Sequence, residues 1–146
     1  MNYSQKGLKI YLAARYERRE ELKKYVNQLQ QLDYEITARW LNSDHDVCDN
    51  NTKNMLQKSI WALEDKQDIV KSDLFLCFTD TEGGSGGRHV EFGIALAERK
   101  EIIVIGPREN IFHCLEYPFI SAVFERWEQF YEEANICKPL ITSGNE

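Results

Sequence analysis

Short apolar runs alternate along this chain with stripes of apolar residues at helical spacing. Five runs predict strands, at residues 8–14, 34–40, 74–79, 102–105 and 122–124. Between and after these runs, apolar residues recur every three or four positions. This spacing predicts four helices, over residues 17–31, about 52–71, 89–99 and 126–134.

The strict alternation of strands and helices predicts an α/β fold with right-handed crossovers. We expect a three-layer sandwich, flavodoxin-like or Rossmann-like, in which helices cover both faces of a central parallel five-stranded sheet. The 146 residues fit one domain, 1–146, with a core over about 8–136 and a loose tail at 138–146. Residues 42–51 are rich in Asp and Asn, and we expect this loop to lie over the site.

Composition excludes several classes of function. A formal net charge of −6 argues against a nucleic-acid partner, and no apolar run approaches the length of a membrane span. The first six residues lack the apolar core of a signal peptide, so we expect a cytoplasmic protein. The four cysteines are widely separated, which predicts reduced thiols and neither zinc nor disulfides: Cys48, Cys77, Cys114 and Cys137.

A glycine-rich segment, residues 83–87, separates the strand at 74–79 from the helix at 89–99. This order brings a helix N-terminus to the carboxyl edge of the sheet, where open α/β folds bind ligands. Glu91 stands among apolar residues in the expected first turn of that helix. The helix dipole there favours the ionised carboxylate, which suits a nucleophile. The plainer interpretation is a connecting turn and a solvated or paired acid.

Other polar and aromatic residues near the same edge have two interpretations each. Arg15 and Arg18 follow the first strand and fit a phosphate pocket, or they are solvated in the first turns of a helix. Trp40 either stacks on a base or packs in the core. His45 lies among three aspartates, and such a run in a polar loop is more often solvated than bound to metal. We predict no metal and no cofactor.

Three segments together resemble the nucleoside 2-deoxyribosyltransferase family. They are residues 9–13, KIYLA, residues 65–73, DKQDIVKSD, and residues 86–97, GGRHVEFGIALA. The similarity extends from about residue 9 to residue 124. The family includes deoxyribosyltransferases, which exchange bases on 2′-deoxynucleosides, and 2′-deoxynucleoside 5′-monophosphate N-glycosidases, which hydrolyse the base from the sugar.

The resemblance implies a role for three side chains. Glu91 matches the nucleophile, Asp65 the acid that contacts the base and assists its protonation, and Tyr11 the hydroxyl that orients the nucleophile. Asp65 is otherwise a helix-surface residue, and Tyr11 a core residue. By the same resemblance we expect a homo-oligomer, because Asn110 and His113 follow the fourth strand, where the family often reaches into a neighbouring subunit's pocket.

The Ser at position 85 determines which substrate the resemblance leads us to expect. Six residues before the nucleophile, the base-exchanging branch commonly has Asp, whereas the nucleotide-hydrolysing branch has a Ser that binds the 5′-phosphate. We therefore expect an N-glycosidase of a (deoxy)nucleoside 5′-monophosphate, acting through a covalent glycosyl-Glu91 intermediate. The alternatives are a base-exchanging transferase, a protein that only binds nucleotides, and a glycosidase of another nucleotide. The predicted substrate-binding residues around the loop are Ser85, Gly86, Gly87, Arg88 and His89, and we expect Ser85 and the backbone N–H groups of Gly86 and Gly87 to contact the 5′-phosphate.

Overall fold

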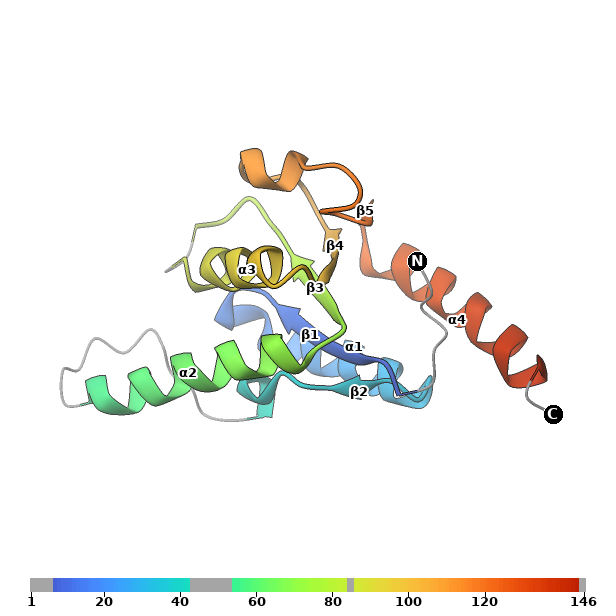
Figure 1. Cartoon of the computed structure of the whole chain (residues 1–146), viewed down its shortest axis with the longest axis horizontal. Coiled ribbons are helices and arrows are strands. Elements are labelled where there is room, and N and C mark those ends of the chain that lie inside the picture. Colours follow the sequence, from blue (N-terminus) through green and yellow to red (C-terminus); the bar gives the residue numbers. More distant parts are fainter. Residues whose placement is uncertain (1–6, 43–53, 84–85, 145–146) are drawn as a thin grey trace.

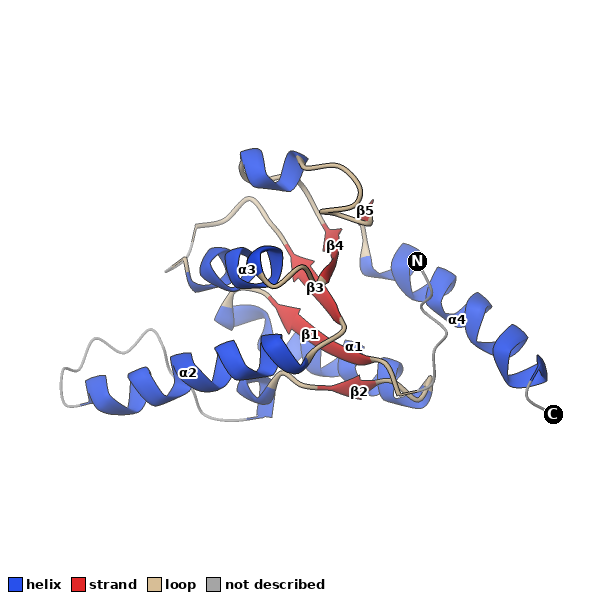
Figure 2. Ribbon diagram, viewed as in Figure 1, coloured by secondary structure: helices blue, strands red, loops and turns tan. Residues whose placement is uncertain are grey.

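A five-stranded parallel sheet forms the centre of the molecule (Figures 1 and 2). The computed structural model describes residues 7–42, 54–83 and 86–144, with side chains as far as residue 136. The strands lie in the order β2-β1-β3-β4-β5, the flavodoxin-like order. Their bounds are Lys9–Ala13 for β1, Glu35–Ile36 for β2, Leu74–Phe78 for β3, Glu101–Ile105 for β4 and Ala122–Phe124 for β5.

Helices cover both faces of this sheet, so the predicted three-layer α/β sandwich is confirmed. Figure 2 shows α2 and α3 in front of the sheet and α1 behind it. On the rear face, Tyr25 of α1 stacks on Trp127 of α4, with ring centroids 4.3 Å apart. The indole of Trp127 also donates a hydrogen bond to Gln28 over 2.8 Å. The helices are α1 (Arg19–Gln31), α2 (Met55–Lys71), α3 (Gly87–Ala97) and α4 (Trp127–Gly144), with short 3-10 helices η1 (Tyr16–Arg18), η2 (Arg39–Asn42) and η4 (Ile111–Cys114).

The core lies between these layers, and β3 is its most deeply buried strand. Every residue of β3 is buried, as expected for a strand with helices on both sides. Phe75 of β3 stacks on Tyr11 of β1 and meets the edge of Phe92 of α3. These three aromatic rings fix α3 against the centre of the sheet, close to the carboxyl ends of β1 and β3.

The second strand is much shorter than the pattern over residues 34–40 predicts. Only two residues form β2, and the chain then turns into η2. Two long-range contacts favour this turn. The Arg39 backbone amide and guanidinium donate to Asp68 on α2, and the Trp40 indole donates to the Leu12 carbonyl over 2.9 Å. The alternating apolar residues of the segment 34–40 are therefore buried in a turn and do not form a long strand.

The apolar stripe on α2 also differs from expectation. Leu56, Ile60 and Leu63 are exposed, and the buried residues of this helix are Asp68 and Ile69.

Two helix boundaries also differ from the prediction: α3 begins two residues before the predicted start, and α4 extends beyond the predicted residue 134. The loop expected over the site falls almost wholly in residues 43–53, outside the described part. Among the described residues, no helix has the length and apolar content needed to cross a lipid bilayer.

Candidate active site

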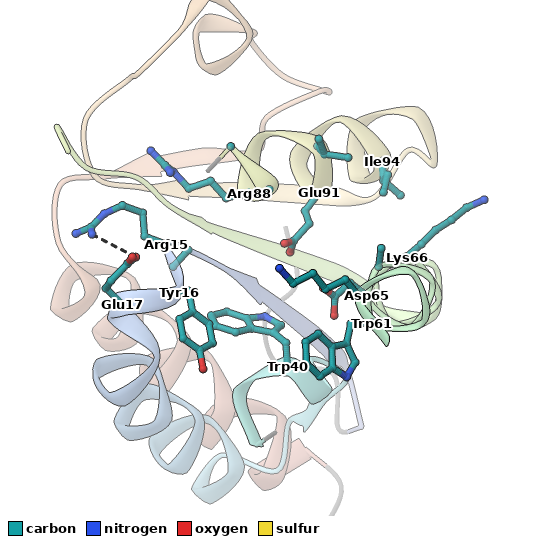
Figure 3. A pocket seen from close by; sticks show the side chains of 16 residues that line it. Arg15, Tyr16, Glu17, Trp40, Trp61, Asp65, Lys66, Arg88, Glu91 and Ile94 are labelled. Carbon is teal, nitrogen blue, oxygen red and sulfur yellow. Dashed lines mark ion pairs between the residues drawn. The ribbon is translucent and has the colours of Figure 1, made fainter. Parts of the chain in front are cut away.

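A pocket of about 330 Å³ opens at the carboxyl edge of the sheet (Figure 3). Four separate segments line it: the chain after β1, η2, the inner face of α2, and the beginning of α3. The sequence predicted that segments after the first and second strands and the glycine loop would meet at this edge. The structure brings them together because parallel strands end side by side.

Glu91 projects from α3 into this pocket and is held by Tyr11. The Tyr11 hydroxyl donates a hydrogen bond to Oε2 of Glu91 over 2.6 Å, across 80 residues of sequence. Tyr11 itself is fully buried and stacked on Phe75, so its hydroxyl has little freedom to turn away. One carboxyl oxygen of Glu91 is thus fixed by a rigid donor, which leaves Oε1 to face the pocket.

Burial, rather than the helix dipole, controls the ionisation of Glu91. Burial raises the pKa of Glu91 to about 8; the Tyr11 hydrogen bond opposes this shift, and the charge of Asp65 adds to it. The sequence predicted the opposite direction. Because α3 begins at Gly87, Glu91 lies in the second turn, and its first turn holds no acidic residue. The field of the helix N-terminus falls off within the first turn, so it is too weak here to offset desolvation.

Asp65 lines the same pocket from α2, in the direction towards which the Glu91 carboxyl group points (Figure 3). Its Oδ1 atom is buried and accepts no hydrogen bond from any described residue. Burial raises the pKa of Asp65 to about 7; the charges of Asp68 and Glu64 add to the shift, and Arg39 opposes it. A half-protonated carboxyl group near neutral pH can both donate and accept a proton.

Two indole rings lie together beside the carboxyl groups, from Trp40 of η2 and Trp61 of α2 (Figure 3). Trp40 is buried, and its ring nitrogen is satisfied by Leu12, so it offers an apolar face to the pocket. We did not expect Trp61 from the sequence. Its position four residues before Asp65, on the same face of a helix, was the available signal. The pair gives the pocket aromatic surface of the kind on which aromatic ligands stack.

The beginning of α3 forms the opposite wall of the pocket. Gly86 caps the helix with a left-handed φ of 88°, a conformation that favours glycine, and both Gly86 and Gly87 line the pocket. Backbone N–H groups in the first turn of a helix have no partner within the helix and can bind an anion. The prediction for Ser85 concerns a residue outside the described part of the chain.

The three arginines and the histidine that were predicted to bind substrate do not all reach the pocket. Arg15 and Arg88 line the pocket, whereas Arg18 and His89 do not. Arg15 donates from Nε to Asp80 over 2.8 Å, and Arg18 pairs with Glu21 at the same distance. Arg88 is buried and forms an ion pair with Glu109. Each of these guanidinium groups is therefore already paired with a carboxylate.

His89, Glu109 and His113 form a cluster near α3 whose ligand atoms lie within 4.8 Å of one another. Two contacts make it a poor metal site. The Glu109 carboxylate accepts from Arg88, whose charge would repel a cation. The Nδ1 atom of His113 accepts the Glu109 amide over 3.0 Å, whereas a metal-binding imidazole normally donates from its second nitrogen. Asn110 caps η4 and lies 3.5 Å from His89, within the same chain.

Comparison with solved structures identifies the fold. The chain is similar to a 2-deoxyribosyltransferase from Bacillus psychrosaccharolyticus, with a TM-score of 0.65 at 19% identity over 84% of this chain and 90% of that one. It is similar to the CMP N-glycosidase BcmB of Clostridium botulinum, with a TM-score of 0.57 at 18% identity over 88% and 98%. A conserved protein from Enterococcus faecalis gives 0.56 at 17% identity over 89% and 98%.

The chain has the fold of these proteins. No protein-family model and no curated protein matches it. At this level of identity the likeness concerns the backbone architecture, so the chemistry has to be inferred from the side chains in the pocket.

Proposed function

We propose that this protein is an enzyme that breaks the N-glycosidic bond of a nucleoside or nucleotide through a covalent glycosyl-Glu91 intermediate. The observation that carries the proposal is the partly buried Glu91 carboxyl group, fixed by the Tyr11 hydroxyl and facing Asp65 across a pocket with two indole rings. Two of the similar structures, a 2-deoxyribosyltransferase and a CMP N-glycosidase, act on such a bond.

Each carboxyl group has a distinct part in this reaction. The ionised Oε1 of Glu91 attacks C1′ of the sugar as the bond to the base breaks, and the electron pair of that bond leaves with the base. For this step the proton that the two carboxyl groups share lies on Asp65; because the pKa of Glu91, about 8, is above that of Asp65, about 7, this reactive form is the less populated one. Asp65 then gives its proton to the departing base. A water molecule then attacks C1′, the bond between C1′ and Glu91 breaks, and a proton of the water passes to Asp65. The Tyr11 hydrogen bond stabilises the ionised form of Glu91 before attack.

The apolar half of the pocket fits the base. Trp61 and Trp40 offer aromatic surface next to Asp65, so a base stacked there would present a ring nitrogen to the proton donor. The sugar would then lie between this surface and Glu91, with its 5′ end towards Gly86 and Arg15. The expected 5′-phosphate contacts depend on Ser85, which is not described, and on arginines that already have acidic partners. The expected homo-oligomer remains a prediction.

The test is a panel of ribonucleosides, 2′-deoxynucleosides and their 5′-monophosphates, with free base followed by chromatography. Glu91→Gln keeps the size of the side chain and removes the nucleophilic charge, so we expect a loss of at least two orders of magnitude in rate. Asp65→Asn should slow release most for bases that leave poorly without protonation. Glu133→Gln, at an exposed position of α4, is the matched control and should retain full activity.

Addition of a second free base separates hydrolysis from base exchange. A new nucleoside would indicate transfer, and free base alone would indicate hydrolysis by water. Full activity of Glu91→Gln would refute the covalent mechanism. Tight binding of a panel member without release of base from any of them would mean that the protein only binds nucleotides.

A further inference from the structure

Lys58 of α2 differs from the three other cations that line the pocket. Arg15 and Arg88 are each paired with a carboxylate, and Lys66 extends away from the carboxyl groups of the site (Figure 3). Lys58 forms no hydrogen bond or ion pair with any residue of 7–42, 54–83 or 86–144, yet it is partly buried. A charged group that loses hydration without a protein partner is available to a polar group of the ligand.

Lys58 shares one face of α2 with Trp61 and Asp65. Trp61 follows it by three residues and Asp65 by seven, spacings that place all three side chains on the same side of a helix. Along this face the order is ammonium, indole and carboxyl group, and all three line the pocket. Lys58 and Asp65 are two turns apart, about 10 Å along the helix axis, with the aromatic surface between them.

This order decides which edge of a stacked base each side chain meets. In the proposed reaction Asp65 protonates a ring nitrogen, and a base stacked on Trp61 extends from there towards Lys58. The ammonium group has three donors and no acceptor. A carbonyl oxygen at the edge of the base remote from the sugar can accept a hydrogen bond from it. An amino group at that edge would place two donors against each other and leave both unpaired.

The same contact would act on the leaving group. As the bond to C1′ breaks, its electron pair moves into the base, and an oxo base spreads part of this negative charge onto its carbonyl oxygen. A fixed ammonium group beside that oxygen stabilises the charge where it develops. Lys58 would transfer no proton in this step, because Asp65 supplies the one that the base takes up.

We propose that Lys58 is a specificity-determining residue that selects bases with a carbonyl group at the edge remote from the sugar, such as hypoxanthine and uracil, over the corresponding amino bases, adenine and cytosine. This inference rests on the proposed function and names the class of base that the same pocket takes. It gives the end of the pocket beyond Trp61 a part in the choice of substrate.

The experiment compares bases that differ in this one exocyclic group. The ratio of kcat/KM is measured for hypoxanthine against adenine and for uracil against cytosine. All four substrates are 2′-deoxynucleosides, or all four are 5′-monophosphates if these are cleaved faster, so the sugar and its 5′ group cancel. Lys58→Met keeps the length of the side chain and removes its charge, and we expect both ratios to fall at least tenfold. Comparison between the two proteins cancels the intrinsic difference between the leaving groups.

Lys71→Met is the matched control. Lys71 is an exposed lysine at the C-terminal end of the same helix, and its replacement should leave both ratios unchanged. Since Lys58 has no partner in the described part of the chain, we expect Lys58→Met to fold as the original protein does.

The outcomes separate this inference from the proposed function. Ratios that Lys58→Met leaves unchanged, or an equal loss for all four bases, would overturn the role of Lys58 and leave the proposed function standing. Release of no base from any of the four substrates by the original protein would refute the proposed function. The same ratios, taken from dissociation constants measured by calorimetry, would then test the contact alone. Failure of all four substrates to bind would overturn both.

Discussion

Glu91→Gln should make the protein more stable at high pH while it removes activity. The free energy of unfolding links to pH through the proton that Glu91 binds more tightly in the folded state. Its pKa is raised by burial from 4.5 to about 8, so the folded protein loses stability as the pH rises through that window. Gln cannot ionise. The variant therefore escapes this loss, and the difference between the two proteins should grow with pH.

The raised pKa sets the scale of the effect. A shift from 4.5 to about 8, at about 1.4 kcal/mol for each pKa unit, is worth roughly 5 kcal/mol. This is an upper limit, because Glu91 lines an open pocket and water can reach its charged form. We expect about 2 kcal/mol at pH 9 and almost nothing at pH 5, on the order of 4–8 °C in Tm at the higher pH. Asp65 also has a raised pKa, but it is present in both proteins and largely cancels.

Urea unfolding of both proteins at pH 5, 7 and 9 gives the measurement. Glu133→Gln, an exposed carboxylate on α4, controls for the general loss of one negative charge and should show no such trend. A Glu91→Gln protein that gains no stability over the original between pH 5 and pH 9 would refute the conclusion that burial governs this carboxyl group. If Glu91→Gln gains stability at high pH but keeps its turnover, the raised pKa of Glu91 would stand, and its role as the nucleophile would be refuted.

Three further outcomes follow from the geometry. Tyr11→Phe removes the hydroxyl that lowers the pKa of Glu91, and Glu91, with a pKa of about 8, titrates above Asp65, with a pKa of about 7, so the limb of kcat/KM that falls at high pH should move to still higher pH; an unchanged limb would contradict this role. Trp61→Ala should raise KM about three- to tenfold with kcat nearly unchanged, whereas a loss confined to kcat would argue against stacking. Gly106→Ala places a Cβ 2.5 Å from Thr79 at a φ of +121°, so thermal unfolding should show a loss of about 2–4 kcal/mol; a loss below about 1 kcal/mol would contradict the contact.

Local hydrophobic pattern was sufficient for most of the fold. The strands at the centre of the sheet are continuous apolar runs, because helices cover both of their faces and every position must be apolar. The helix ends were predicted less well. α3 begins at Gly87 rather than near His89, a difference of half a turn that moves Glu91 out of the first turn, and burial then raises its pKa where the sequence predicted a lower one.

The pattern failed where burial depends on a partner distant in the sequence. Residues 34–40 look like a strand, yet Asp68 draws Arg39 into a turn and Leu12 accepts the Trp40 indole. The stripe on α2 looks like a core face, but Leu56 and Ile60 are exposed among the described residues. Hydrophobic periodicity shows that one face of a segment is apolar, but it does not show which neighbouring element, if any, packs against that face.

The candidate site shows the same division. The sequence alone determined the α/β order and placed a glycine-rich segment and Glu91 at the carboxyl edge of the sheet, because both features are local. Only the tertiary structure set Tyr11 against Glu91, 80 residues away, and Asp80 against Arg15, 65 residues away. Those contacts decide which carboxyl groups are neutral and which arginines are already paired. Charge and burial act through space, so residue types and spacing along the chain cannot fix them.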